Sequence, residues 1–411
     1  MKVIVIGGGP AGMMAAIRAA ENSAEVVLLE KNNRLGKKLS ITGKGRCNLT
    51  NTAEISEVVK NIPGNGKFLY SALKNFSTAD TINFFESLGL KTKIERGGRV
   101  FPQSDNAAEV IEVLTKKLAM LNVDVQLNSK VTEIISDGKK ILGVEVGEKF
   151  FDADKIILAT GGASYPATGS TGDGFKFAKK LGHTVTKIFP ALVPLEVEED
   201  FAKDLQGLSL KNVRVTLKAD EKKVTEIFGE MLFTHFGISG PIILTLSGQV
   251  AKLLDEKKFV EVVINLKPAL TAEQLDARIL RDFEKFKRKS AKNSLVELLP
   301  QKLIPIILDL AYIDEEKKVD AITKIERQRL IKILQNLPLT VTKTRPLSEA
   351  IVTAGGVSVK EINPKTMESK IVSGLYIVGE VADVDGFTGG FNLQAAWATG
   401  NAAGLSVTKK F

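Results

Sequence analysis

The first twelve residues constrain the fold more than any other part of the chain. Lys2–Ile6 reads KVIVI, and the glycine-rich run GGGPAG follows it without a break. A short β-branched apolar run predicts a strand buried on both faces, and the run after it fits the pattern G-x-G-x-x-G. The helix-compatible stretch MMAAIRAAEN comes next, and then a second apolar run, AEVVLLE. This order predicts a parallel α/β sheet with a dinucleotide-binding loop.

The residues of this loop have separate roles in the predicted site. Gly7 permits the tight turn, Gly9 lets a pyrophosphate approach the backbone, and Gly12 lets the helix pack on the strand. Pro10 and Ala11 lie between the last two glycines, and we assign them to the same site. The helix start offers free N–H groups and the positive end of its dipole to the phosphates.

Glu30 ends the second strand, 18 residues after Gly12 (30 − 12). An acid about 20 residues beyond the glycines hydrogen-bonds the ribose 2′-hydroxyl in such sites. We assign Lys31, the next residue, to the same adenosine end. Together the strands, glycines, helix and acid predict a dinucleotide with a free 2′-hydroxyl.

Two further strand ends favour FAD over NAD. Lys155–Ala159 leads into Thr160-Gly161, and Leu375–Val378 leads into Gly379-Glu380. Ligands of open α/β sheets bind at the carboxyl ends of strands. Three such ends marked by glycine are more than NAD needs, whereas extended FAD must be held at several points. We expect non-covalent FAD, with Glu380 accepting a hydrogen bond from a ribityl hydroxyl.

A second glycine loop stands near the C-terminus, in TGGFNLQAAWATG (Thr388–Gly400). We expect Gly390 to start a helix whose first N–H groups face the N1/C2=O edge of the flavin; these belong to Asn392, Leu393 and Gln394. That edge gains negative charge on reduction, so a helix N-terminus stabilises the reduced form. The alternative is a turn before a surface helix.

Several long motifs carry a family resemblance. They occur in the order NNRLGKKLSITGKGRCNLTN, ATGGASYPATGSTGDGF, LFTHFGISGP, EAIVTAGGVSVKEINPKTMESK and LYIVGEVADVDGFTGGFNLQAAWATG. With them the chain resembles, over nearly its whole length, the BaiN-like NAD(P)/FAD-dependent flavoproteins, also described as the aminoacetone oxidase family. The resemblance implies an α/β FAD-binding domain of the glutathione-reductase Rossmann type. It also implies that a β-barrel-like domain and a helical insertion interrupt this domain.

The local patterns agree with that organisation. We expect the first part of the FAD-binding domain over residues 1–190, a β-rich insert over 191–270, a helical insertion over 271–335, and over 336–411 a return to the β domain and then to the FAD-binding domain. Phe189–Leu195 has two prolines and is typical of a linker. VRVTLKA and VEVVINL alternate as strands do, and Thr271 to Gln274 form a capping box. Helices are expected at Ser77–Leu88 and Asp105–Leu121.

Arg34–Asn48 is a basic, glycine-bearing segment just after the adenosine acid. Composition alone indicates a solvated loop, and the family resemblance reverses that interpretation. It implies that Lys38 and Arg46 contact the cofactor phosphates and that the turn at Gly43 approaches the ribityl chain. Cys47 lies inside the motif and is assigned to the cofactor site, but not as a redox centre, because a single buried thiol usually packs as a small hydrophobe.

The chain has only two histidines, and their contexts differ. His183 follows the helical pattern GFKFAKKLG and is expected to help end that helix. His235 lies in FTHFGISGP, a polar turn between apolar runs, where we place it on the substrate side of the flavin. The alternative is a structural imidazole. Tyr165, in GASYPATG, is a weaker catalytic candidate of the same kind.

Composition excludes several classes. No apolar run reaches the roughly 20 residues of a membrane helix, and the N-terminus lacks a signal-peptide pattern. One cysteine excludes an internal disulfide, and no metal site is expected. We therefore expect a cytoplasmic protein without a membrane partner. The net charge of +9 is spread along the chain, and its densest cluster, Arg281–Lys292, has acids interleaved, which favours a solvated helix over a nucleic-acid site.

The expected function is hydride transfer between a small organic substrate and flavin N5. The resemblance leaves two reactions open: oxidation of an amino ketone or amine with O2, or reduction of an enone-like bond with NAD(P)H. No second complete G-x-G-x-x-G unit occurs in the middle of the chain, so any nicotinamide binds transiently at the flavin. The alternative from another class is a flavin-bearing RNA-associated factor that uses its basic surface.

Overall fold

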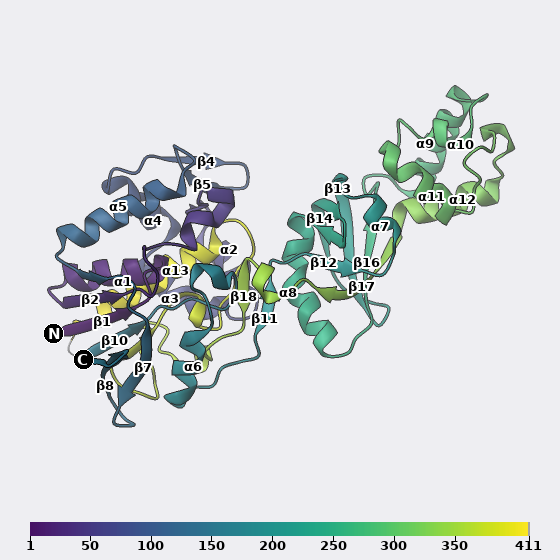
Figure 1. Ribbon diagram of the computed structural model, residues 1–411. Coiled ribbons are helices and arrows are strands. Elements are labelled where there is room, and N and C mark those ends of the chain that lie inside the picture. The colour runs from purple at the N-terminus through teal and green to yellow at the C-terminus, as the bar shows by residue number, and fades with distance from the viewer. Residues whose placement is uncertain (410–411) are drawn as a thin grey trace. The chain divides into compact units, whose positions relative to one another are not determined.

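A computed structural model describes residues 1–409, and Figure 1 shows its elements in chain order. The chain forms two compact units. The sheet unit comprises Met1–Ala191 and the chain from Leu347 onward, and the barrel unit comprises Leu192–Pro346. The elements of each unit are described separately below.

A five-stranded parallel sheet is the centre of the sheet unit. Its strand order is β19 (Leu375–Ile377), β10 (Lys155–Leu158), β1 (Lys2–Ile6), β2 (Glu25–Leu29) and β6 (Asp124–Gln126). β1 is the middle strand, and Val3, Ile4 and Val5 are fully buried. This confirms the predicted strand and its burial on both faces.

Helices from both ends of the chain pack together in this unit (Figure 1). The helices of the unit are α1 (Pro10–Glu21), α2 (Ile55–Lys60), α3 (Tyr70–Asn75), α4 (Thr78–Ser87), α5 (Ala107–Met120), α6 (Asp173–Lys180) and α13 (Phe391–Ser406). α4 and α5 lie where the sequence predicts them, and Ser77 caps α4 through a capping box with Asp80. α13 is buried along almost its whole length, so the alternative of a surface helix is wrong.

Three smaller sheets complete the sheet unit. β3 (Thr50–Asn51), β5 (Arg99–Pro102) and β4 (Thr92–Glu95) form one, and β7 (Val131–Ser136), β8 (Ile141–Val146) and β9 (Lys149–Asp152) form another. β11 (Phe189–Ala191) pairs antiparallel with β18 (Val352–Ala354). The linker predicted over Phe189–Leu195 does contain the boundary between the two units, after Ala191, but its first three residues form a strand. A two-stranded pair consists only of edge strands, which tolerate the missing N–H of Pro190.

The barrel unit is built on a closed six-stranded barrel. Around it run β12 (Leu195–Val197), β15 (Gly237–Ser239), β14 (Lys222–Thr234), β13 (Ser209–Ala219), β16 (Val260–Asn265) and β17 (Leu337–Thr344). Alternate residues of β13 are buried, as the alternating sequence predicts. α7 (Phe201–Asp204) and α8 (Pro241–Asp255) complete this part. The coarse expectation of an α/β Rossmann fold with a barrel is confirmed, while the finer glutathione-reductase type stays a prediction.

Four helices follow the barrel strand β16 in the chain. They are α9 (Ala272–Lys285), α10 (Ala291–Ser294), α11 (Ile304–Leu310) and α12 (Lys324–Gln335). The predicted capping box from Thr271 to Gln274 is present, and Thr323 caps α12 in the same way. Leu275 and Leu330 belong to one continuous core with the barrel side chains. Within residues 1–409, no helix combines the length and apolar character needed to cross a bilayer.

His183 is buried at the end of α6. Its N–H donates to the Ala178 carbonyl at 2.9 Å, so the residue helps end the helix as predicted. Its ring lies between Glu361 and Ser369, with Nδ1 3.1 Å from Glu361 Oε2 and Nε2 2.9 Å from Ser369 Oγ. Burial lowers the pKa of His183 below its ordinary value of about 6.5, although Glu361 opposes this shift.

The lowered pKa predicts a loss of stability in mild acid. Below pH about 6.5 the unfolded chain binds a proton at His183 that the native protein does not, so the free energy of unfolding falls as pH decreases. For one proton the slope is at most about 1.4 kcal/mol per pH unit. His183→Gln removes this titration and should flatten the decline between pH 7.5 and 5.5. Urea unfolding at several pH values measures the slope, and identical slopes for both proteins would contradict the assignment.

Candidate active site

The N-terminal glycine loop has the geometry that a pyrophosphate site needs. A Cβ added at Gly7 would lie 2.6 Å from the Ala159 carbonyl oxygen, and one at Gly12 would lie 1.9 Å from the Gly7 oxygen. Only glycine permits these approaches, and Gly7 also has a φ of +107°. At Gly9, by contrast, an added Cβ would meet nothing within 4 Å. The open space at Gly9 fits a ligand that approaches the backbone.

The start of α1 leaves donors free beside that space. The N–H groups of Gly9, Ala11 and Gly12 donate to no other residue in the described chain. Pro10, at the first helical position, has no N–H to leave unpaired. A helix N-terminus with unused donors is a ready anion site. The donor set therefore fits the pyrophosphate of FAD.

Glu30 joins the carboxyl end of β2 to the glycine loop. Its side chain is buried, with Oε2 accepting from Gly8 N and Oε1 from Asn32 N, both at 2.7 Å. The acid is thus oriented by backbone N–H groups on both sides. This placement agrees with a carboxylate held ready for ribose hydroxyls.

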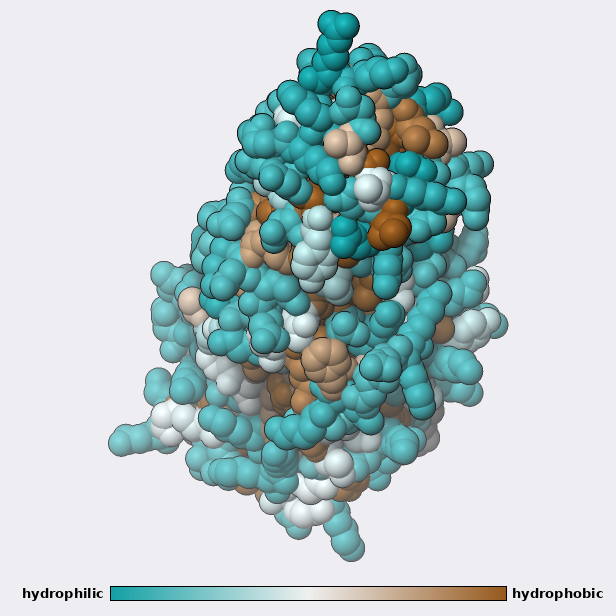
Figure 2. All heavy atoms as spheres, turned by 90° about the vertical axis from the view of Figure 1, so that its right-hand side faces the viewer, coloured by the Kyte–Doolittle hydropathy of each residue, from teal (hydrophilic) through white to brown (hydrophobic). Residues whose placement is uncertain are grey.

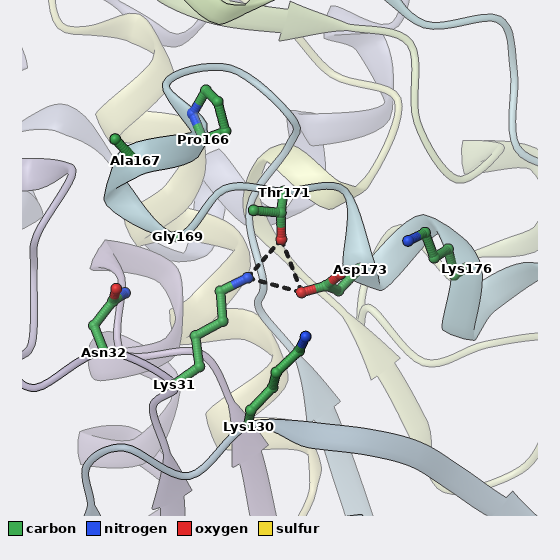
Figure 3. A pocket seen from close by; sticks show the side chains of 9 residues that line it. All are labelled: Lys31, Asn32, Lys130, Pro166, Ala167, Gly169, Thr171, Asp173 and Lys176. Carbon is green, nitrogen blue, oxygen red and sulfur yellow. Dashed lines mark hydrogen bonds and ion pairs between the residues drawn. The ribbon is translucent and has the colours of Figure 1, made fainter.

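A pocket of 360 Å³ adjoins this acid (Figure 3). Lys31 Nζ points across it and donates to Thr171 Oγ1 at 2.6 Å and to Asp173 Oδ2 at 2.7 Å. Figure 3 shows the ammonium of Lys130 directed toward the same group. The remaining lining residues are Asn32, Pro166, Ala167, Gly169 and Lys176. Because Asn32 bonds Glu30 directly, this pocket offers room beside the acid for a group such as adenosine.

A second polar group lies at the carboxyl ends of β10 and β19. Lys38 Nζ is 2.9 Å from Glu380 Oε2 and donates to Ser164 Oγ at 2.7 Å. Glu380 also accepts from Thr353 N at 2.8 Å. Burial alone would raise the pKa of Glu380. Lys38 and the Thr353 N–H outweigh burial, so the pKa is lower than its ordinary value and the carboxyl is ionised. The sequence predicts Lys38 at the phosphates and Glu380 at the ribityl chain. In the structure the two side chains are paired.

Thr160 and Gly161 follow β10 at the same edge of the sheet. The Thr160 hydroxyl is buried and has no hydrogen-bond partner within residues 1–409. The hydroxyl packs against α6, because a Cβ added at Gly174 would lie 2.1 Å from it. Gly161 and Gly379 both have left-handed φ values, +72° and +70°, which favour glycine at these turns. These turns follow β10 and β19 and lie in the same unit as the pair of Lys38 and Glu380.

Other residues of the basic segment have structural partners. Arg46 stacks over the Phe101 ring at 4.2 Å and pairs with Glu95 and Asp105. Gly43 has a φ of +58° inside the 3₁₀ segment Leu39–Gly45, as a turn requires. Cys47 is fully buried, and burial raises its pKa to about 12, so it is a thiol at neutral pH.

The C-terminal glycine loop does begin a helix. Gly390 has a φ of +96°, and a Cβ there would lie 2.3 Å from the Thr50 carbonyl oxygen. The N–H groups of Asn392 and Leu393 donate to no other described residue. The Gln394 N–H, however, donates to the Gly390 carbonyl at 3.0 Å. The prediction that this N–H is free for a ligand is therefore wrong. It is the fourth residue of the helix and makes the first regular helical hydrogen bond.

Side chains fix this loop in place. Gln394 is fully buried, accepting from Thr50 Oγ1 at 2.6 Å and from Thr81 Oγ1 at 2.8 Å. The Asn392 side chain makes two hydrogen bonds to the Gly386 backbone. It accepts from the N–H and donates to the carbonyl, both at 2.7 Å. These contacts give the helix start a fixed position.

The two catalytic candidates lie in different units. Tyr165 is in the sheet unit and has a φ of +50°. In sequence it stands between Ser164, which donates to Glu380, and Pro166, which lines the pocket near Glu30. His235 is in the barrel unit at the exposed tip of the β14–β15 hairpin. Its ring packs edge-on against the Phe236 ring, with the two ring centroids 4.8 Å apart. The structure thus does not bring the two together in one unit.

Arg345 is a residue that sequence reasoning missed. Its guanidinium lies 4.8 Å from the Phe236 ring centroid, and Nη1 donates to Glu196 at 2.8 Å. The hairpin tip therefore has an imidazole, an aromatic ring and a guanidinium together. Nearby in sequence, the Thr234 hydroxyl is buried without a partner among the described residues. No local sequence signal connects Arg345 to a hairpin more than 100 residues earlier.

The two glycines Gly9 and Gly12 allow a matched test of the pyrophosphate site. Gly9→Val should fold, because φ is −82° and the space is open, yet it should contain no FAD, because the side chain fills that space. Gly12→Val should lose the fold itself, because Gly7 occupies the position of its Cβ. Flavin absorbance and circular dichroism of both variants test this. Normal FAD content in folded Gly9→Val would contradict the site.

Comparisons with known proteins show the family of this chain. The family model described as HI0933-like protein Rossmann domain matches residues 1–406. The chain is 35% identical over 411 residues to the 3-dehydro-bile acid delta(4,6)-reductase of Clostridium scindens, covering 100% of this chain and 99% of that protein. It is 31% identical over 412 residues to the ribosomal RNA dihydrouridine synthase of Haemophilus influenzae, covering 99% and 98%.

A solved structure shows the same fold. The 3-ketosteroid delta1-dehydrogenase of Sterolibacterium denitrificans, in complex with 1,4-androstadiene-3,17-dione, superposes with a TM-score of 0.55 at 12% identity, covering 99% of both chains. The solved structure shows the fold, and the family model and the full-length relatives show the family. The chain therefore belongs to the HI0933-like Rossmann family, the BaiN-like flavoproteins, and is an enzyme of the FAD-dependent oxidoreductase type.

Proposed function

We propose that the protein is an NAD(P)H-dependent reductase that saturates a carbon–carbon double bond conjugated to a carbonyl group. The full-length similarity to a relative named 3-dehydro-bile acid delta(4,6)-reductase carries this proposal. In such a reaction NAD(P)H gives up a hydride, one substrate carbon gains it, and the neighbouring carbon gains a proton. When bound, FAD takes the electron pair from the nicotinamide and passes it to the substrate.

The sheet unit supplies binding and orientation in this proposal. The start of α1 holds the pyrophosphate, and Glu30 and Lys31 hold the adenosine end. Glu380 orients the ribityl chain, while the ammonium of Lys38, 2.9 Å away, keeps that carboxylate ionised. The free N–H groups of Asn392 and Leu393 stabilise negative charge on the flavin edge.

The barrel unit supplies substrate recognition. Arg345 and His235 are hydrogen-bond donors at the hairpin tip, and Phe236 gives them a rigid apolar support. We assign His235 as the group that donates a proton or polarises the substrate carbonyl, and Arg345 as the group that orients the carbonyl. No second glycine-rich dinucleotide motif occurs in the middle of the sequence, so NAD(P)H binds directly at the flavin and leaves before the substrate enters.

A uracil base in RNA is the second candidate substrate. Two relatives named ribosomal RNA dihydrouridine synthase, from Haemophilus influenzae and Escherichia coli, match 99% and 96% of this chain. The C5=C6 bond of uracil is conjugated to the C4 carbonyl, so dihydrouridine formation is the same chemistry as reduction of an enone. The net charge of +9 favours a polyanionic substrate.

Anaerobic stopped-flow spectroscopy tests the proposal. NADH or NADPH should bleach the flavin, and a cyclic enone such as a 3-oxo-Δ4 steroid or uridine in RNA should restore its colour without oxygen. His235→Ala should retain FAD, and its substrate half-reaction should slow by about 10²–10⁴-fold if the imidazole acts as a positioned acid. His183→Gln, at the other histidine, is the matched control and should react at the wild-type rate.

Two results would count against this function. Bleaching by amines or amino ketones but not by reduced nicotinamides would instead establish the oxidase reaction that the family resemblance left open. An unchanged substrate half-reaction in His235→Ala would make that residue structural. Loss of FAD from this variant would likewise remove its catalytic assignment.

A further inference from the structure

Tyr312 has an unusual combination of backbone and side-chain properties. It follows α11 in the left-handed region, with a φ of +55°, where helix ends usually place glycine. Its N–H donates to the Asp309 carbonyl and the next N–H, of Ile313, to Leu308. A bulky residue in this conformation is strained, and strain that persists suggests a function.

Packing does not explain the tyrosine. Its side chain is 79% exposed, more than any other large apolar or aromatic side chain within residues 1–409. Glycine would satisfy the backbone better, and no core contact would be lost.

One face of α12 lies beside that ring. The guanidinium of Arg329 is 5.6 Å from the Tyr312 ring centroid, and its Nη2 donates to the Tyr312 carbonyl at 3.4 Å. Ile325 and Lys332 share this helix face, because they stand four residues before and three residues after Arg329. Ile325 is 69% exposed, and Lys332 is also exposed. We call Tyr312, Ile325, Arg329 and Lys332 the α12 platform.

The charge of the α12 platform is positive. Arg329 and Lys332 form no ion pair with any residue of the described chain, and neither does exposed Lys324 at the start of the helix. The acids near Tyr312 in sequence are Asp309 and the run Asp314–Glu316, of which Glu315 and Glu316 are paired with Lys292. Figure 2, which views the protein from the side of α9–α12 in Figure 1, shows a mainly hydrophilic surface with separated apolar patches.

We propose that the α12 platform binds single-stranded RNA, with one base stacked on Tyr312 and the adjacent phosphates held by Arg329 and Lys332. An exposed aromatic ring beside a guanidinium is the arrangement on which unpaired bases stack. The unpaired cations Arg329 and Lys332 favour a polyanion such as RNA. The inference rests on the RNA form of the proposed function, and it deepens it by naming where the substrate is held.

Binding of a fluorescent oligouridylate of about 12 nucleotides to the full-length, FAD-loaded protein tests the platform. Tyr312→Ala should weaken binding about tenfold, since stacking contributes about 1–3 kcal/mol per base and 1.4 kcal/mol is tenfold. Tyr312→Phe should retain wild-type affinity, because the ring is kept. Arg329→Ala and Lys332→Ala should each lower the slope of log affinity against log salt by about 1.

Tyr70→Ala is the matched control, because Tyr70 is an exposed tyrosine of the sheet unit. It should bind RNA as the wild type does. Flavin reduction by NAD(P)H and reoxidation by a small enone should be unchanged in Tyr312→Ala, which shows that the enzyme is intact.

The outcomes separate this inference from the proposed function. Wild-type affinity in Tyr312→Ala, or no RNA binding by the wild type at low salt, would overturn the α12 platform while leaving enone reduction intact. A Tyr312-dependent complex with a protein and none with RNA would also overturn it. Tyr312-dependent RNA binding without any reduction of enone or uridine would support the platform and refute the reductase.

Discussion

The close contact between α1 and α13 is the constraint on which the site depends. A Cβ added at Gly400 would lie 2.4 Å from the Ala11 carbonyl oxygen, and one at Gly404 would lie 2.5 Å from the Ala15 oxygen. The two helices therefore run parallel, and only glycine allows their backbones to come so close. α13 begins nine residues before Gly400, whereas α1 begins one residue before Ala11. The N-terminus of α13 thus projects about 12 Å beyond that of α1, at 1.5 Å per residue.

This offset explains why one chain has glycine loops at both ends. Each loop exposes a helix N-terminus with free N–H groups, and the two starts are separated along one direction. An extended cofactor needs a binding point for its pyrophosphate and another for its ring system, and we propose that the two starts provide them. The carboxyl ends of β10 and β19 in the same unit add the pair of Lys38 and Glu380. In the barrel unit, described by itself, His235, Phe236 and Arg345 lie together at one hairpin.

Sequence reasoning succeeded where the signal is local. The strand Lys2–Ile6, the capping box at Thr271 and the helix start at Gly390 each follow from a few adjacent residues, and all are present. It was incomplete or wrong where partners are distant. Lys38 pairs with Glu380 across 342 residues, and no local pattern could reveal that contact. Phe189–Ala191 has the composition of a linker, yet it becomes a strand because Val352–Ala354 lies beside it. The use of the Gln394 N–H within its own helix could have been foreseen by counting from the helix start.

The identity of the bound cofactor is the most direct test of this account. Protein purified without added flavin should be yellow, and heat or acid should release one FAD per chain into solution, identified by chromatography. FAD is expected because the pyrophosphate loop, the ribose acid and the adenosine pocket are all formed in the sheet unit. Release of FMN, or a colourless protein that gains no flavin spectrum when FAD is added, would contradict the central claim.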